Sequence, residues 1–109
     1  MGHFLLLHLD CIFKGKKLTG TSQVDHFIPW SFVKEDKLWN FVLACPFCNT
    51  RKNNKLPAQI YVEKLEKRNQ KIVLASGFSR KQFESYRHGL ISYLWQYAYC
   101  AGFKEYKNQ

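Results

Sequence analysis

The sequence predicts a small α+β fold, in which two short strands and a short helix are followed by a mostly helical second half. Residues 21–27 alternate enough between polar and apolar side chains to form a short strand. Residues 41–44 are a second apolar run, which ends at a Cys-Pro pair. Residues 58–109 contain no proline and carry apolar side chains at helical spacing. We therefore expect a strand, a loop, a strand and a helix, with longer helices after them.

The helix that follows the second strand is expected over residues 47–54. Spacings of three and four residues place Asn49, Lys52 and Asn53 on one face of this helix. The next helix is expected to start at Pro57, because proline suits the first turn of a helix.

That longer helix should end near Val73. The apolar residues Ile60, Leu65 and Ile72 are its expected inner side.

The last helix has the clearest local signals. Ser79 is expected as its N-cap with Gln82 as capping-box partner, and Phe78 and Phe83 are placed as a hydrophobic staple. Gly102 is expected to end it. Its apolar stripe, which we interpret as packing against the core, consists of Phe83, Tyr86, Leu90, Leu94, Ala98 and Ala101.

The length and charge of the chain limit what it can be. At 109 residues it has room for one domain, residues 1–109, with a core at about 11–57 and a helical extension at about 58–109. Lys and Arg outnumber Asp and Glu 17 to 8, for a net charge of +9. A small protein this basic commonly binds a polyanion, such as nucleic acid or an anionic membrane face.

No apolar run approaches the roughly 20 residues that span a bilayer, so a transmembrane protein is not expected. The N-terminal residues lack the pattern of a secretory signal, and we expect a cytoplasmic protein with reduced thiols. The chain is also open to interpretation as a fragment of a longer protein. Its protein partners cannot be inferred from the sequence.

Residues 24–52 contain the groups that phosphodiester hydrolysis needs. The imidazole of His26 is the candidate general base, because it can take a proton from water at physiological pH. Asp25 and Asn49 offer the hard oxygen ligands that a magnesium ion (Mg²⁺, or Mn²⁺) prefers. Lys52, one helical turn after Asn49, is a candidate to contact the phosphate.

The order Asp25-His26, Asn40 and Asn49 resembles the HNH endonuclease family, with its ββα-metal fold, from residue 24 to residue 57. It is also similar to the HNH nuclease domain of RNA-guided CRISPR effectors. The resemblance implies that His26 is the general base, that Asp25 and Asn49 bind the catalytic cation, and that Asn40 braces the loop by hydrogen bonds. Asn49 stands where histidine is frequent, which favours Mg²⁺-like ions over softer metals. The resemblance further implies cleavage or nicking of DNA, expected to be double-stranded, with 5′-phosphate and 3′-hydroxyl products.

Many HNH proteins hold a structural zinc ion (Zn²⁺) between two Cys-x-x-Cys knuckles. Here Cys45 and Cys48 form one knuckle, while the upstream one keeps Cys11 but has Lys14 in place of its second cysteine. His8 could complete a Cys₃His site with these three cysteines. A redox pair or inert packing are the alternatives for the Cys45/Cys48 pair.

Further residues have expected binding or packing roles. Arg51, Lys52 and Lys55 form a basic cluster, for which we prefer DNA phosphate contact over a solvated helix face. Trp30 and Trp39 are expected to pack within their loops rather than to stack on DNA bases.

Cys100, in the last helix, is expected to be a buried free thiol. The alternative function for the whole chain is a catalytically inactive HNH-like, zinc-binding DNA-binding module that kept the fold and the basic surface.

Overall fold

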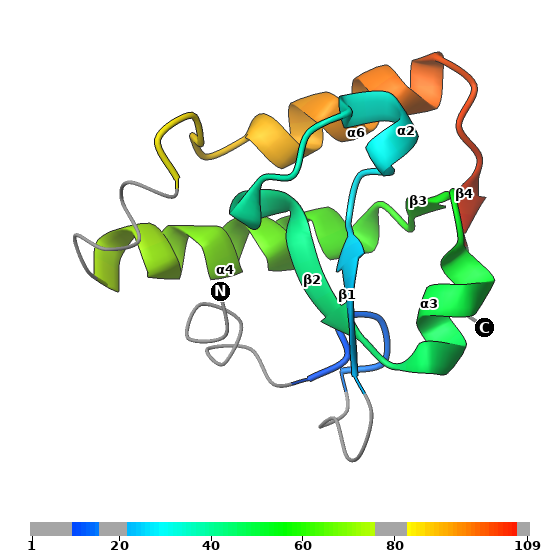
Figure 1. Ribbon diagram of the computed structural model, residues 1–109. Helices are drawn as coiled ribbons and strands as arrows, with labels where there is room; N and C mark the ends of the chain where they lie inside the picture. Colours follow the sequence, from blue (N-terminus) through cyan, green and yellow to red (C-terminus); the bar gives the residue numbers. More distant parts are fainter. Residues whose placement is uncertain (1–9, 16–21, 76–82, 107–109) are drawn as a thin grey trace.

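The structure is a computed structural model and describes residues 10–15, 22–75 and 83–106 (Figure 1). Two small sheets and three longer helices make up the fold. In chain order the elements are β1 (Gln23–His26), α2 (Trp30–Val33), η1 (Leu38–Asn40), β2 (Phe41–Ala44), α3 (Pro46–Lys52), β3 (Leu56–Pro57), α4 (Ile60–Ala75), α6 (Leu90–Cys100) and β4 (Glu105–Tyr106).

Strands β1 and β2 and helix α3 form a ββα unit at the centre of the fold. The two strands pair antiparallel, with Asp25 opposite Val42 and His26 opposite Phe41. Helix α3 follows β2 at once, because Cys45 is its N-cap and Pro46 fills its first turn. The predicted α+β fold class is therefore confirmed, and the second predicted strand, residues 41–44, has the same bounds in the structure.

The bounds of α3 differ from the prediction. The helix starts at Pro46 and ends at Lys52, whereas residues 47–54 were expected. It ends there because Asn53 has a φ of 48° and ψ of −124°, outside the helical region. Asn53 therefore lies beyond the helix and does not share a helical face with Asn49.

Helix α4 begins at Ile60, so the prediction that it starts at Pro57 is wrong. Pro57 instead belongs to β3, which pairs in parallel with β4 through Leu56 and Glu105 and through Pro57 and Tyr106. Ile60 is 78% exposed, against the expectation that it faces the core. The helix continues to Ala75, two residues beyond the predicted end.

The inner face of α4 includes the other two predicted residues, Leu65 and Ile72, which are fully buried. Both belong to a single apolar core that also contains Phe27 and Ile28, after β1, and Ile91 of α6. This core supports the ββα unit from the side of the two long helices (Figure 1).

The last helix is shorter than predicted. Residues 83–85 form a turn, and α6 begins at Leu90 after Gly89, whose φ of 98° interrupts a helix. The predicted cap residues Ser79 and Gln82, with Phe78, lie outside the described residues. The part of the stripe closest to the core is Phe83 and Ala98, with Tyr86, Leu90 and Leu94 partly buried against it and Ala101 exposed.

The predicted end of α6 at Gly102 is confirmed. Gly102 has a φ of 103°, its N–H bonds to the Tyr99 carbonyl, and the Phe103 N–H bonds to the Ala98 carbonyl at 3.1 Å. These two bonds form a Schellman motif, which needs a left-handed residue at this position. Cys100 is exposed, so the expected buried thiol is wrong; it lies on the side of α6 opposite to the buried face.

Buried polar side chains of α4 hold the junction between η1 and β2. The Arg68 guanidinium donates to the Phe41 carbonyl at 2.6 Å, and the Asn69 amide donates to the Trp39 carbonyl at 2.9 Å. Burial lowers the pKa of Arg68 to about 9, although the nearby Tyr86 acts to raise it. Helix α4 thereby fixes the backbone beside His26, whose ring lies edge-on to Phe41.

No helix within the described part of the chain is both long and apolar enough to cross a bilayer.

Candidate active site

Asp25 of β1 forms an ion pair with a buried lysine of α3. The Lys52 ammonium lies 3.3 Å from Asp25 Oδ2 and donates to the His26 carbonyl at 3.0 Å. The Lys52 side chain is 1% exposed and that of Asp25 is 16% exposed. Burial lowers the pKa of Lys52, while the Asp25 charge acts to raise it. Lys52 therefore does not belong to an exposed basic cluster with Arg51 and Lys55, as the sequence suggested.

The side-chain amide of Asn49 faces the same carboxylate. Its nitrogen is placed to donate to Asp25 Oδ2 at 3.2 Å and to Asp25 Oδ1 at 3.3 Å, and its oxygen is directed to the Gln23 side-chain amide at 2.5 Å. A hard divalent ion such as Mg²⁺ takes carboxylate and amide oxygens as ligands. The residue types of Asp25 and Asn49 therefore fit such an ion, with the Asn49 amide rotated to present its oxygen.

His26 is the last residue of β1 and is held by an acidic residue of the following loop. Its Nε2 lies 2.8 Å from Asp36 Oδ1. Because a carboxylate only accepts hydrogen bonds, Nε2 carries the proton in this contact. The neutral ring therefore has Nδ1 as its acceptor, the tautomer that can take a proton from water.

Asp25 and His26 line one hollow of about 170 Å³, although neighbouring residues of a strand normally point to opposite faces. Strand β1 ends at His26, and the hydrogen bond from the Phe27 N–H to the Asn40 carbonyl at 2.8 Å extends the same antiparallel register by one residue. The hollow is lined by Asp25, His26, Pro29, Trp30, Lys52, Asn53 and Asn54.

Asn40 is fully buried and binds the chain just after β1. Its Oδ1 accepts from the Ile28 N–H at 2.8 Å, and its Nδ2 donates to the Ile28 carbonyl at 2.9 Å. Both polar groups of one loop residue are therefore satisfied by a single side chain, which fixes where the chain turns after His26.

The two tryptophans differ in environment. Trp39 is 5% exposed, which agrees with its expected packing role, whereas the Trp30 side chain is only half-buried, at 50% exposed. Trp30 opens the four-residue helix α2, which buries none of its residues fully. Its indole instead borders the hollow at Asp25 and His26.

Three cysteines meet at the start of α3. The sulfur atoms of Cys11, Cys45 and Cys48 all lie within 4.8 Å of one another. Zinc–sulfur bonds of about 2.3 Å place the sulfurs of a tetrahedral site roughly 3.8 Å apart, so this arrangement fits zinc with a small adjustment. His8, the predicted fourth ligand, lies outside the described residues.

The thiols of this cluster have opposed pKa shifts. Burial raises the pKa of Cys48 to about 12, helped by hydrogen bonding to Cys45 and by the nearby Cys11. Burial also acts to raise the pKa of Cys45, but hydrogen bonds from Cys48 and Cys11 and the charge of Lys14 outweigh it and lower the pKa to about 7. One thiol is therefore ready to ionise at neutral pH, while its neighbour keeps its proton.

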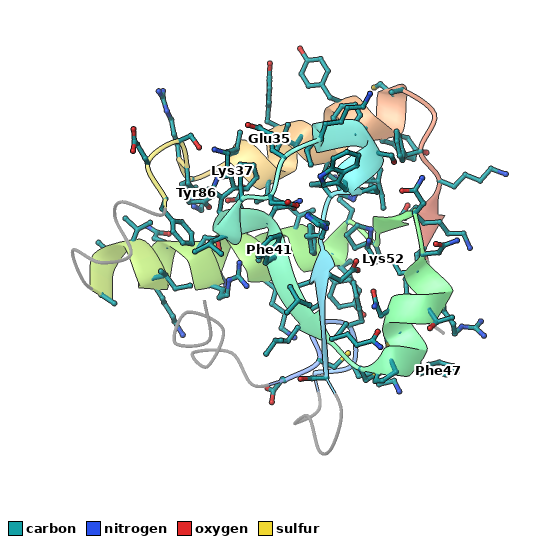
Figure 2. All side chains as sticks on the ribbon, viewed as in Figure 1. Glu35, Lys37, Phe41, Phe47, Lys52 and Tyr86 are labelled. Atoms are coloured by element: carbon teal, nitrogen blue, oxygen red, sulfur yellow. The ribbon has the colours of Figure 1, made fainter. Side chains whose placement is uncertain are left out.

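Lys14 does not enter the cluster. Its ammonium lies 4.8 Å from the centre of the Phe47 ring, and the Arg51 guanidinium lies 5.2 Å from the same ring. Phe47 projects outward from α3 and is 55% exposed (Figure 2). These two cations and an aromatic ring form an exposed basic face next to the cysteines.

Some residues of this site were not predicted from the sequence. Asp36 lies in a charged loop, Lys34-Glu35-Asp36-Lys37, where no periodicity distinguishes one carboxylate from another. Asn54 accepts a hydrogen bond from the Ser31 hydroxyl at 2.8 Å. These contacts join segments that are distant in sequence, and the only available signal was the polar character of the turn after α3.

Comparison with protein-family models matches residues 11–58 to the HNH endonuclease family. No curated protein matches the chain. Residues 11–58, which carry the site, are therefore similar to HNH endonucleases, and the match supports a nuclease of the HNH type. Nucleases of this family act on nucleic acid and generally use a divalent metal.

Proposed function

We propose that the protein is a metal-dependent endonuclease that hydrolyses phosphodiester bonds of double-stranded DNA. The observation that carries the proposal is the position of the Asn49 side-chain amide against the Asp25 carboxylate, one residue away from an imidazole with a defined acceptor nitrogen. A carboxylate, a side-chain amide and a base in one place are groups that metal-assisted hydrolysis uses.

His26 acts as the general base in this proposal. Its Nδ1 takes a proton from a water molecule, and the water oxygen attacks the phosphorus while the bond to the 3′ oxygen breaks. The 3′ oxygen then takes a proton from solvent, which leaves a 5′-phosphate and a 3′-hydroxyl. Asp36 holds the protonated Nε2 and steadies the positive charge that the ring acquires.

Asp25 and Asn49 would hold the Mg²⁺ or Mn²⁺ ion. When bound, that ion supplies positive charge that neutralises the phosphate and stabilises the departing oxygen. Lys52 balances the Asp25 charge from the protein side and keeps the carboxylate on the side of α3. Arg51 and Lys55, which are exposed, are the proposed DNA phosphate contacts.

Nicking of supercoiled plasmid in the presence of Mg²⁺ tests the proposal. His26→Ala should reduce the rate by a factor of about 10² to 10⁴, the usual contribution of a general base. His88→Ala removes an exposed histidine outside the site and is the matched control. Equal nicking by wild type and His26→Ala would remove His26 from its role. A single-stranded circular DNA in the same assay tests the preference for a duplex.

We also propose that Cys11, Cys45 and Cys48 bind a structural zinc ion, with His8 as the fourth ligand. The proximity of the three sulfurs supports this. Elemental analysis should find one zinc per chain in wild type and in Cys100→Ala, but not in Cys48→Ala; zinc retained by Cys48→Ala would contradict the site. A thiolate site requires reduced cysteines, which agrees with the expected cytoplasmic location.

We further infer that residues 1–109 work as one domain. The pairing of β3 with β4, and the hydrogen bond from the Trp95 indole to the Pro57 carbonyl at 2.8 Å, support this by joining the helical extension to the end of the HNH segment.

A further inference from the structure

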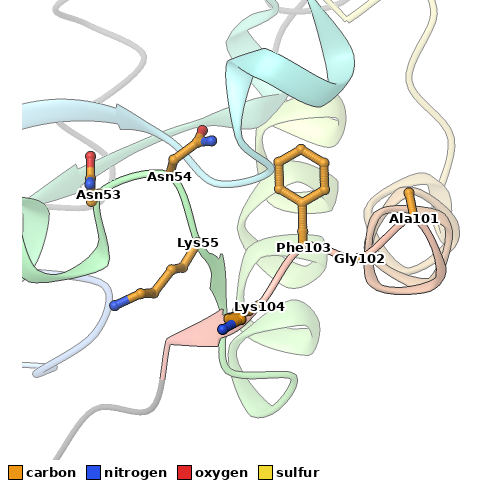
Figure 3. Close-up of a pocket in the computed structure, with 7 residues that line it drawn as sticks. All are labelled: Asn53, Asn54, Lys55, Ala101, Gly102, Phe103 and Lys104. Atoms are coloured by element: carbon orange, nitrogen blue, oxygen red, sulfur yellow. The ribbon is translucent and has the colours of Figure 1, made fainter.

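A second hollow adjoins the one at Asp25 and His26. It has a volume of about 430 Å³ and lies between the turn after α3 and the segment after α6 (Figure 3). Its lining consists of Asn53, Asn54, Lys55, Ala101, Gly102, Phe103 and Lys104. Asn53 and Asn54 also line the first hollow, so the two hollows are neighbours.

The lining of the second hollow is basic. It contains Lys55 and Lys104 and no acidic side chain. Within residues 10–15, 22–75 and 83–106, neither lysine has an ion-pair partner. The Leu56 N–H bonds to the Lys104 carbonyl at 2.8 Å, which keeps the backbones at Lys55 and Lys104 next to each other although the two lysines are 49 positions apart in sequence.

Hydrogen bonds and ring contacts fix the walls of this hollow. The Ser31 hydroxyl holds Asn54, and the Phe103 ring lies edge-on to Phe32 with their centres 5.6 Å apart. The Schellman motif at Gly102 fixes the direction of the chain into Phe103. A preformed, positively charged depression can bind an anion with little cost of ordering.

We propose that the second hollow binds the part of the DNA strand next to the bond that is cut, with Lys55 and Lys104 each on a backbone phosphate. The inference rests on the proposed function, because the shared residues Asn53 and Asn54 place this hollow beside the proposed catalytic one and so define which part of the DNA reaches it. Asn53 and Asn54 lie between the two subsites, and Phe103 offers an apolar surface to a sugar or base. Residues 101–104 lie outside the HNH-matched segment 11–58, so the C-terminal extension would contribute directly to substrate binding.

The first test measures binding of a labelled DNA duplex at several salt concentrations, in a His26→Ala background that leaves the DNA intact. Each phosphate contact contributes about 0.9 to the slope of log affinity against log salt. The double variant Lys55→Ala, Lys104→Ala should therefore lower that slope by about 2 and weaken binding about tenfold. Lys67→Ala, Lys71→Ala removes the same charge from exposed positions of α4 and should leave the slope unchanged. Equal effects of the two double variants would overturn the subsite.

The second test changes the hollow without removing a lysine. Ala101 has an ordinary φ of −79° and lines the hollow, so a longer side chain fits its backbone. Ala101→Glu should weaken binding about tenfold through repulsion of phosphate, and Ala101→Gln, with the same size and no charge, should not. Equal binding by the two would overturn the proposal.

Cleavage separates this inference from the proposed function. In the His26-containing protein, Lys55→Ala, Lys104→Ala should raise the KM for plasmid nicking about tenfold and change kcat less than twofold. Wild-type protein that binds DNA with the expected salt slope but never nicks it would refute the nuclease proposal alone. Wild-type nicking with a KM that the double variant leaves unchanged would refute the subsite alone.

Discussion

The two ends of α3 carry two sites that are stabilised in different ways. Its start holds Cys45 and Cys48, whose thiols crowd against Cys11, while its end holds Lys52, which pairs with Asp25. In the half with the Asp25–Lys52 pair, which is the proposed catalytic half, the protein itself supplies the opposite charge. In the cysteine half, the described residues place like groups together, with pKa values driven apart to about 7 and about 12. We therefore expect the site at Asp25 and Lys52 to keep its shape without metal. The cysteine site should depend on a bound zinc ion for its shape.

Selective removal of each metal tests this comparison and should give the largest effect of the variants and conditions proposed. Stripping zinc with a strong chelator should lower Tm by more than about 10 °C, because a structural zinc can contribute on the order of 10 kcal/mol to folding. Omission of Mg²⁺ should abolish nicking and leave Tm within about 2 °C. Thermal melts and nicking assays on the same samples separate the effects of the two metals. A Tm that does not change when zinc is removed would contradict the dependence of the cysteine site on zinc.

Breaking the buried pair tests the metal-independent half. Lys52→Met keeps the length of the side chain but leaves Asp25 without its partner and the His26 carbonyl without its donor. Loss of one member of a buried pair should cost about 3 kcal/mol of unfolding free energy, measured by urea denaturation. Lys55→Met, at an exposed lysine three residues later, should change it by less than about 0.5 kcal/mol. Similar values for both variants would mean that the pair does not support the site.

Asn40→Ala should have the next largest effect. It removes both hydrogen bonds to the Ile28 backbone and leaves two buried polar groups unsatisfied, which should cost about 2 kcal/mol. Nicking should fall as well, because the chain after His26 loses its anchor. Asn54→Ala, at an exposed asparagine, is the control for stability, and an Asn40 variant as stable as this control would contradict the bracing role.

The cysteine half can also be probed by its pH dependence. In zinc-free protein, Cys45 should be about half thiolate near pH 7, so its rate of alkylation should rise through that pH and level off above about pH 8. Cys48, with its pKa raised to about 12, should remain unreactive over the same range. Mass spectrometry after timed alkylation identifies the modified residue. Preferential modification of Cys48 would reverse the assignment, and zinc should protect both.

The sequence predicted the parts of the fold that depend on local patterns. The strand at residues 41–44 was predicted correctly because an apolar run ends at Cys45-Pro46. The start of α4 was not, because Pro57 pairs with Tyr106, a residue 49 positions away. The prediction of one long last helix was wrong at Gly89, because its positive φ cannot be recognised from helical periodicity.

The same limit applies to the site. Residue types and order pointed to Asp25, His26 and Asn49, which the structure brings to neighbouring positions on β1 and α3. Helical spacing alone predicted that Lys52 lies on the surface. Its burial depends on a contact with Asp25, 27 residues earlier, and on the fit of α3 against β1, which are properties of the packed chain.

The smallest expected effect concerns the loop carboxylate beside His26. Asp36→Ala removes the acceptor of the Nε2 hydrogen and should lower kcat about tenfold with KM unchanged, since the ring loses its preferred tautomer and orientation. Glu35→Ala is a matched control, because Glu35 is the adjacent exposed carboxylate and lies 3.9 Å from Lys37 without contact to the histidine. Asp36→Asn, whose side-chain oxygen can still accept from Nε2, should recover most of the activity. If Asp36→Ala and Glu35→Ala nick at the same rate, the histidine is oriented without Asp36, and the catalytic half depends only on the contacts made by α3.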